Sequence, residues 1–464
     1  MNVPSSQQLR LLPAVERVLN LPPLVSLCAQ YGRGTVTGWV RQTLHDFRCG
    51  AAGPLSSIAT EIEARVVQMV SELAEASTLQ RLRKVINGTG VILHTNLGRA
   101  PLAPAAIEAM IEAAAATNLE VDLTTGRRGR RAAAVETLCR EVTGAEAALV
   151  VNNCAAATLL TLQTLAAGRR VIISRGQLIE IGGSFRLPDV FQQAGVTLHE
   201  VGTTNRTRLA DYAQAIGPES AALLRVHPSN YRISGFCESV AIAELAMLGK
   251  QHQLPAIDDV GSGCLYDLTG YGLPDEPIVR ESLQAGADLV LFSGDKLLGG
   301  PQCGVIVGRA DLVARLRSNP LARALRVDKV TLAALQATLE IHRAGRAFTD
   351  IPVLRQLSLA ADELHARGTQ LLGQLQAVTS HAEAFSLEAV MSAPGGGTLP
   401  DQTLPSWAVA VNSSNANELS QRLRLGTPAV FARVQEGLTL VDLRTVNPDD
   451  DSTLVRCLAE SVAE

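Results

Sequence analysis

Seven short, largely apolar runs recur between about residues 86 and 330, and they constrain the fold more than any other feature of the sequence. The runs are Ala147–Val151, Val171–Ser174, Val196–Val201, Leu223–Val226, Ala256–Val260, Leu289–Phe292 and Val305–Val307. Continuous apolar runs of this length are typical of strands that are buried on both faces, and most intervals between them are long enough for a crossover helix. The pattern therefore predicts an α/β domain built on a mostly parallel sheet.

Different patterns flank this segment. Before it, apolar residues such as Val36, Val40 and Leu44 fall on one helical face, and glycine-rich joints separate the helices. After it come a long helical stretch, a glycine-proline passage at 393–397 that predicts a loop, and two further apolar runs that predict strands. We expect a helical amino-terminal domain over 1–85, an α/β large domain over 86–330 and a small α+β carboxyl-terminal domain over 331–464.

Composition excludes several classes of protein. Hydrophobic residues make up 47% of the chain and charged residues 19%, which is incompatible with wholesale disorder. Aromatic residues make up only 3%, so few side chains can stack on bases, and nucleic-acid binding would have to rest on shape and charge. The longest apolar stretch, 147–168, is interrupted by polar residues, and we expect no membrane span.

The cysteines and the start of the chain indicate a cytoplasmic protein. None of the eight cysteines forms a C-x-x-C pair or has a histidine at zinc-ligand spacing, so we expect neither a metal site nor a disulfide framework. Scattered thiols suit a reducing compartment. Residues 1–20 contain no apolar core or cleavage site of a secretory signal.

Charge is distributed unevenly along the chain. Residues 1–85 carry nine basic and six acidic side chains and are net +3, whereas the rest carries 32 basic and 39 acidic ones and is net −7. One interpretation is a small helical bundle with ordinary surface charge. The other is a module that docks an anionic partner.

The densest chemical signal is the decapeptide Ser293–Gln302, which contains Lys296 within a glycine-rich loop directly after a buried strand. Lysine is rarely buried without a reason, and desolvation lowers its pKa so that the amine becomes nucleophilic. Nearby glycines allow a flat cofactor to approach the backbone. A lysine that only caps a turn or pairs with Asp295 is the alternative.

Two acidic residues and a helix start complete the pattern. Asp258 and Asp259 end another buried strand, where open α/β sheets place their ligands, and a carboxylate there can keep a pyridine nitrogen protonated. The strand that ends at Val151 runs through Asn153, Cys154 and Ala155 into a helix, whose free N–H groups would receive a phosphate. Either aspartate could equally be a helix cap or an ion-pair partner.

These three elements, in this order, resemble a pyridoxal-phosphate enzyme with the aspartate-aminotransferase fold (PLP fold type I). Longer strings narrow the resemblance to bacterial selenocysteine synthases, the L-seryl-tRNA(Sec) selenium transferases, over nearly the whole chain. The strings are 87–99, Ile181-Gly182-Gly183-Ser184-Phe185-Arg186, Glu200–Thr207, Asp259–Gly263 and Ser293–Gln302.

The resemblance implies roles for individual residues. Lys296 matches the lysine that carries pyridoxal 5′-phosphate, Asp259 matches the aspartate on the ring nitrogen, and Asp295 matches a catalytically important acid. Asn153, Cys154 and Ala155 would receive the cofactor phosphate, although Cys154 stands where the family is expected to have asparagine. The arginines that match those holding selenophosphate, the selenium donor, are Arg99, Arg323 and Arg326.

The implied reaction converts seryl-tRNA(Sec) to selenocysteinyl-tRNA(Sec). Elimination of water leaves an aminoacrylyl intermediate, to which selenium from selenophosphate is added. Members of the family assemble as homo-oligomers, rings of dimers, and the positive segment 1–85 would dock the tRNA. Loss of water requires a base for the α-proton, which a freed lysine amine can supply.

Alternatives remain open at this point. A related pyridoxal-phosphate lyase or transferase acting on a free small amino acid would share the lysine loop, and a non-catalytic tRNA-binding descendant would not need it. His227 either touches the cofactor or makes a structural hydrogen bond. The basic run Arg127–Arg131 either contacts phosphate or is a solvated face.

Overall fold

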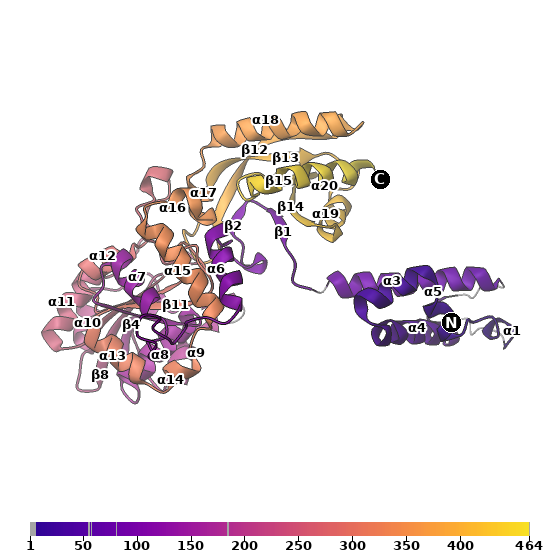
Figure 1. Ribbon diagram of the computed structural model, residues 1–464. Helices are drawn as coiled ribbons and strands as arrows, with labels where there is room; N and C mark the ends of the chain where they lie inside the picture. Colours follow the sequence, from indigo (N-terminus) through magenta and orange to yellow (C-terminus); the bar gives the residue numbers. More distant parts are fainter. Residues whose placement is uncertain (1–5, 54–55, 57, 80, 183–184, 464) are drawn as a thin grey trace. The chain divides into compact units, whose positions relative to one another are not determined.

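The computed structural model describes residues 6–53, 56, 58–79, 81–182 and 185–463. The chain divides into two compact units, Met1–Lys84 and Val85–Glu464 (Figure 1). Gly183 and Ser184 of the motif at 181–186 lie outside the described residues.

The amino-terminal unit is helical, as the apolar spacing predicts. Its apolar side chains, among them Val40, Phe47 and Val66, form a core of their own. Gly32, with a positive φ of 83°, separates the third helix from the fourth. The helices are α1 (Ser6–Leu9), α2 (Val15–Leu19), α3 (Pro22–Tyr31), α4 (Arg33–Arg48) and α5 (Ala59–Leu79).

All seven predicted strands of the large α/β part are present and form one sheet. In spatial order they are β3 (Ala147–Val151), β11 (Gly304–Gly308), β10 (Leu289–Ser293), β9 (Ala256–Gly261), β8 (Ser220–Val226), β4 (Arg170–Ser174) and β7 (Thr197–Val201). β11 runs antiparallel to both of its neighbours, and the pairs from β10 to β7 are parallel. The prediction of a mostly parallel sheet is therefore confirmed.

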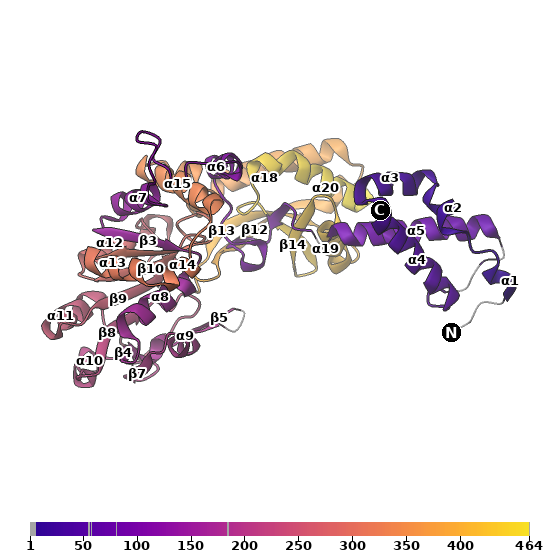
Figure 2. The same ribbon diagram turned by 60° about the horizontal axis from the view of Figure 1, so that its bottom comes forward.

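Helices cover both faces of this sheet (Figure 2). Along β10, Val290 and Phe292 enter one apolar cluster while Leu289 and Leu291 enter the other. This alternation explains why the strand is apolar throughout. One face carries α8 (Cys154–Ala166), α9 (Leu187–Gln193) and α13 (Ala310–Ser318); the other carries α7 (Ala133–Thr143), α10 (Leu209–Ala215), α11 (Ile242–His252), α12 (Val279–Gln284) and α15 (Lys329–Arg343).

The carboxyl-terminal part contains a six-stranded sheet that also takes in residues from before the large sheet. Its order is β1 (Val85–Gly88), β14 (Ala429–Gln435), β15 (Leu438–Asp442), β13 (Leu404–Val411), β12 (Phe385–Gly395) and β2 (Val91–Leu93). Elements next to the expected boundaries at 86 and 331 pack across them. β1 and β2 pair with carboxyl-terminal strands, whereas α15 packs on the large sheet.

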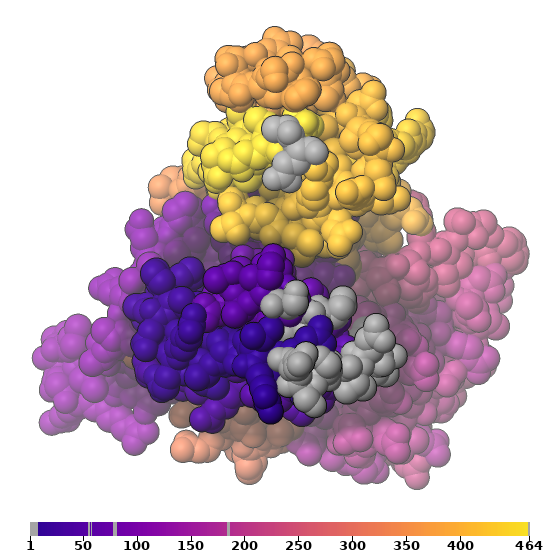
Figure 3. Space-filling model, turned by 90° about the vertical axis from the view of Figure 1, so that its right-hand side faces the viewer, coloured from indigo at the N-terminus to yellow at the C-terminus, as the bar shows by residue number. Residues whose placement is uncertain are grey.

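Helices α18 (Ala361–Val378), α19 (Ala416–Leu425) and α20 (Asp451–Ala463) accompany the smaller sheet, and α18 (orange) and α20 (yellow) are visible together in Figure 3. Within the described residues, no helix combines the length and the apolar composition that a membrane span needs. The remaining elements are short: α6 (Pro104–Ala114), α14 (Leu321–Ala324), α16 (Ala347–Asp350), α17 (Pro352–Ser358) and the hairpin strands β5 (Glu180–Ile181) and β6 (Phe185–Arg186).

The loop predicted at 393–397 is a strand over its first three residues. β12 continues to Gly395 and pairs in parallel with β2. Pro394 has no N–H to donate, but the hydrogen bonds run from the nitrogens of Ala393 and Gly396 to the carbonyls of Gly90 and Leu93. The proline is therefore compatible with the strand, and the chain leaves the sheet only at the last two glycines.

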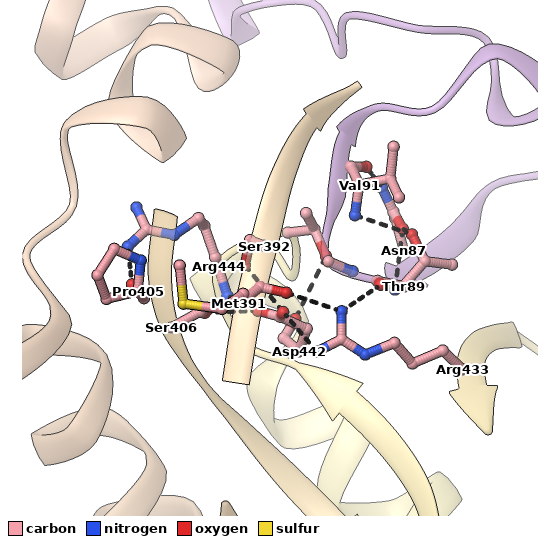
Figure 4. Close-up of polar contacts among 12 residues, drawn as sticks. Asn87, Thr89, Val91, Met391, Ser392, Pro405, Ser406, Arg433, Asp442 and Arg444 are labelled. Carbon is pink, nitrogen blue, oxygen red and sulfur yellow. Dashed lines mark hydrogen bonds and ion pairs between the residues drawn. The ribbon is translucent and has the colours of Figure 1, made fainter. Parts of the chain in front are cut away.

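A buried carboxylate ties the turn between β1 and β2 to the rest of this sheet (Figure 4). Asp442 accepts hydrogen bonds from Ser392 Oγ at 2.8 Å and Ser406 Oγ at 2.6 Å, and it lies 3.6 Å from the guanidinium of Arg433. Gly90 has a φ of 76°, and a Cβ atom there would collide with this carboxylate. Gly90, in the motif at 87–99, thus allows the backbone to approach Asp442 closely.

Candidate active site

A cavity of about 340 Å³ lies where β8, β9 and β10 end. Its wall includes the start of α8, the lysine loop and Gly396–Gly397 from the carboxyl-terminal part. Carboxyl ends of parallel strands are where open α/β sheets place their ligands. Residues far apart in sequence therefore meet in one enclosure.

Lys296 projects into this cavity from the turn after β10 and is only 6% exposed. Its Nζ atom lies 3.4 Å from the carbonyl oxygen of Gly397 and, within the described residues, makes no ion pair with a carboxylate. Burial lowers the pKa of this amine below its usual value. The other lysines of the chain, Lys84, Lys250 and Lys329, are exposed or only half-buried.

Gly397 is required beside the lysine for steric reasons. Its φ is 85°, and a Cβ atom at this position would lie 2.6 Å from Lys296 Nζ. Any other residue would therefore displace the amine. The glycine run was predicted only as a loop, because nothing in the local sequence shows that it approaches a lysine 101 positions away.

The two aspartates of β9 separate onto opposite faces of the strand. Asp258 is fully buried and forms a two-pronged ion pair with Arg225, with both nitrogen–oxygen distances at 2.7 Å. Asp259 faces the cavity instead. The strand's alternation thus assigns Asp258 to an ion pair and leaves Asp259 as the carboxylate available to a ligand.

Asp259 is held by two side chains of α8. Thr158 Oγ1 donates to one carboxylate oxygen at 3.1 Å, and Cys154 Sγ lies 3.7 Å from the other. Burial raises the pKa of Asp259 to about 6, against the opposing effect of the threonine hydrogen bond. Burial also raises the pKa of the Cys154 thiol well above its usual value, so the thiol stays protonated and acts as the donor.

The start of α8 faces the same cavity. Asn153 caps the helix by accepting a hydrogen bond from the Ala156 nitrogen at 2.8 Å, and Cys154 and Ala155 line the wall. The first N–H groups of a helix have no partners within the helix and carry partial positive charge. This end of the cavity is suited to an anion such as a phosphate.

His227 also lines the cavity, directly after β8. Its backbone nitrogen donates to the Asp259 carbonyl at 2.9 Å, while its buried ring atom Nδ1 has no hydrogen-bond partner among the described residues. Burial lowers the pKa of the imidazole to about 4, so the ring is neutral near pH 7. The structure therefore offers an unused polar atom at the cavity wall.

Asp295 and Arg99 form an ion pair at the cavity wall. Arg99 Nη1 lies 2.8 Å from Asp295 Oδ2, and Gln302 Nε2 lies 3.5 Å from the same oxygen. The Arg99 backbone has a φ of 63°, an unusual value for a non-glycine residue. Two residues that were predicted for different roles, an acid and a phosphate ligand, are thus in direct contact.

Arg323 and Arg326 do not line the cavity of their own chain. Arg323 lies in α14, and Arg326 forms an isolated bridge with Val151 and lies 3.7 Å from Glu120. Arg99, Arg323 and Arg326, the arginines predicted to share one anion, are therefore not gathered within a single chain.

Arginines of the basic run 127–131 are paired with acidic side chains. Arg128 and Arg131 contact Glu120, and the guanidinium of Arg130 contacts Glu136.

The residues present fit pyridoxal phosphate. A buried amine, a carboxylate with room for a ring nitrogen and a helix start for a phosphate surround one cavity, and the unpartnered His227 Nδ1 faces it. Three side chains and one glycine that form or support the site were not predicted individually: Thr158, Arg225, Gln302 and Gly397. Thr158 lies one helical turn after Cys154, a spacing that could have indicated a shared face.

Comparison with known proteins identifies the family. Residues 85–447 match a family model described as L-seryl-tRNA selenium transferase, and residues 9–48 match one described as selenocysteine synthase N terminal. The L-seryl-tRNA(Sec) selenium transferase of Moorella thermoacetica is 48% identical over 468 residues, which cover 99% of this chain and 98% of the relative. The enzyme of the same name from Hyphomonas neptunium is 49% identical over 452 residues, 95% and 96% of the two chains.

A solved structure shows the same fold at lower identity. D-glucosaminate-6-phosphate ammonia-lyase matches with a TM-score of 0.55 and 22% identity, over 82% of this chain and 96% of that chain. The predicted α/β fold class is thereby confirmed. By its match to the family model and its near full-length identity to these transferases, the chain belongs to the L-seryl-tRNA selenium transferase family.

Proposed function

We propose that this protein converts seryl-tRNA(Sec) to selenocysteinyl-tRNA(Sec), the activity that its relatives' names state. The observation that carries the proposal is one cavity holding a buried lysine amine, a buried carboxylate and a helix start, in a chain of this family. The cofactor is pyridoxal 5′-phosphate. When bound, it draws electrons from the α-carbon of an attached amino acid and so allows the α-proton and the β-hydroxyl to leave.

Different residues would hold different parts of the cofactor. Lys296 would carry it, Asp259 would keep a proton on the ring nitrogen, and the N–H groups at Asn153, Cys154 and Ala155 would bind the phosphate. Because the backbone supplies these N–H groups, a cysteine at 154 does not remove this contact. His227 is assigned to the cofactor because its ring atom Nδ1 has no other described partner.

Lys296 acts on the substrate, and Asp295 positions Arg99. Burial favours the neutral form of the Lys296 amine, which is the form that removes the seryl α-proton. Asp295 lies next to it in sequence and holds Arg99 at the cavity wall through their ion pair.

The selenium donor is selenophosphate in this proposal, and Arg99, Arg323 and Arg326 bind it. Guanidinium groups match phosphate oxygens in geometry and remain charged at neutral pH. Since only Arg99 lines the cavity of its own chain, we assign the other two to the cavity of a partner in a homo-oligomer. Sedimentation of the purified protein as a monomer at micromolar concentration would contradict this assignment.

The amino-terminal unit is the proposed docking site for the tRNA. It has a core of its own and a net charge of +3, in contrast to the acidic remainder of the chain. We place the protein in the cytoplasm, because its eight cysteines are all free thiols and its substrate would be found there. Recovery in a membrane or periplasmic fraction would contradict that placement.

Substitutions of Lys296 and Arg326 test the activity and separate its two halves. Lys296→Ala should lower both loss of the seryl hydroxyl and selenium addition by at least about a thousandfold, because the cofactor is no longer held covalently and the α-proton has no base. Arg326→Ala should spare loss of water and stop selenium addition. Acid-quenched reactions with seryl-tRNA(Sec) and selenophosphate, assayed for the amino acid on the tRNA, measure both steps.

Lys250→Ala, at an exposed lysine, is the matched control and should be fully active. Wild-type protein that acts on free serine and leaves seryl-tRNA(Sec) unchanged would instead indicate a small-molecule lyase or transferase.

Asp259 should impose a pH dependence on cofactor binding. The pKa of this carboxyl is raised to about 6, so below pH 6 the carboxyl is mostly protonated in the cofactor-free protein. It must lose this proton before it can pair with a protonated ring nitrogen. The contribution of Asp259 to cofactor affinity should therefore fall about tenfold for each pH unit below 6 and be constant above pH 6.

Equilibrium dialysis of pyridoxal phosphate between pH 5 and 8, with wild type and Asp259→Asn in parallel, measures this dependence. The cofactor's own titration is common to both proteins, so the difference between their curves isolates Asp259. Identical curves for the two proteins would rule out the assigned pairing.

Removal of residues 1–84 should separate tRNA binding from cofactor binding. The two units have separate cores, so the remainder should keep the cofactor absorption band while its affinity for tRNA(Sec) falls at least about tenfold. Binding of the full chain should weaken as salt rises, because phosphate contacts release counterions. Filter-binding assays on both proteins measure this; equal affinities would disprove the docking role.

A further inference from the structure

A second cavity, of about 530 Å³, adjoins the cofactor cavity. It lies beyond the ends of β4, β7 and β8, and Val226 and His227 line both cavities. None of the residues assigned so far to the cofactor or to the selenium donor, apart from His227, lines it. Part of its wall is Thr204–Thr207, from the motif at 200–207 that the proposed chemistry does not use.

An aromatic ring lies exposed at the edge of this cavity. Phe236, next to the wall residue Cys237, is 77% exposed in a chain with only 3% aromatic residues. The guanidinium carbon of Arg206, another wall residue, lies 4.2 Å from the centre of the ring. One face of Phe236 is thus covered by a cation, and its high exposure leaves the other face open to a planar group.

The backbone at Phe236 is held in place by contacts between two loops. Asn205 Nδ2 donates to the carbonyl of Phe236 at 2.5 Å, and the nitrogen of Glu238 donates to the carbonyl of Asn205 at 2.9 Å. Glu238 also forms an ion pair with Arg206. The backbone that carries the ring is thus fixed, so it loses little conformational freedom when a ligand stacks on the ring.

The charges of the cavity are paired. Arg225 is bound to Asp258, Arg206 to Glu238, and Arg232 lies 3.8 Å from Asp275. A cavity that is rich in hydrogen-bonding groups but has its arginines neutralised suits a neutral, polar ligand better than an anion. Together with the open aromatic face, this indicates a nucleoside and not a free phosphate.

The position of the cavity agrees with the proposed substrate. The seryl group of an aminoacyl-tRNA is esterified to the ribose of the 3′-terminal adenosine. When the seryl α-carbon is within reach of Lys296, that nucleoside must lie one ester linkage away, in a space next to the cofactor cavity. The second cavity shares two wall residues with the first and meets this requirement.

We propose that this second cavity binds the 3′-terminal nucleoside of the aminoacyl-tRNA, with its base stacked on the open face of Phe236. The inference rests on the proposed function and adds to it a binding site for the end of the tRNA. Phe236 positions the substrate and does not take part in the chemistry.

The test uses the full-length holoenzyme and 3′-serylamino-3′-deoxyadenosine, a non-hydrolysable analogue of the seryl-tRNA end. Calorimetric titration should show that the analogue binds more tightly than free serine. Phe236→Leu, which keeps an apolar side chain but removes the ring, should weaken the analogue about tenfold and leave serine unchanged. Phe236→Trp should restore binding, and Val378→Ala, at a residue of α18 that is 60% exposed, should have no effect.

Steady-state kinetics supply a second measurement. Phe236→Leu should raise KM for seryl-tRNA(Sec) about tenfold with kcat unchanged, since the stacking contact is the same in the bound substrate and the transition state. The site is disproved if the analogue binds no better than serine, or if Phe236→Leu leaves both its affinity and KM unaltered. It is also disproved if serine binding falls equally, because the substitution would then have disturbed the cofactor cavity. Failure of the proposed function looks different: wild-type enzyme would not convert seryl-tRNA(Sec) at all.

Discussion

The desolvated amine of Lys296 is the constraint on which the rest of the site depends. An ammonium group at this depth, which faces a glycine carbonyl and makes no ion pair among the described residues, would be costly to bury, so burial shifts the amine toward its neutral form. The surrounding structure maintains that environment. Gly397 leaves room for the Nζ atom, and Asp295 is occupied by Arg99 instead of neutralising the lysine.

The sheet brings the remaining groups to this amine. Parallel β8, β9 and β10 end at the same edge, which places His227, Asp259 and Lys296 around one cavity. Strand alternation then separates two adjacent aspartates, one into a buried pair with Arg225 and one into the cavity. The same edge continues to β4 and β7, where a second, charge-neutral cavity adjoins the first. The edge of one sheet thus places both the residues of the cofactor cavity and the second cavity next to it.

Sequence patterns predicted what depends on local periodicity. All seven predicted strands are present, because burial on both faces requires apolar residues at every position. The cavity contains Lys296, which follows one such strand, and Asp259, one of two candidate aspartates near the end of another. Contacts between distant segments were not predictable. Neither the approach of Gly397 to Lys296 nor the pairing of β1 and β2 with carboxyl-terminal strands has a local signal. Similarly, the alternation that separates Asp258 from Asp259 becomes decisive only once Arg225 is known to lie on one side.

Reduction of the holoenzyme with sodium borohydride, followed by proteolysis and mass spectrometry, shows directly whether Lys296 carries the cofactor. The chain has only four lysines, Lys84, Lys250, Lys296 and Lys329, so the attachment site can be identified without ambiguity. We expect a pyridoxyl group on the peptide that contains Lys296 and on no other lysine peptide. A stoichiometric adduct on another lysine, or a holoenzyme whose cofactor is not fixed by reduction, would contradict it.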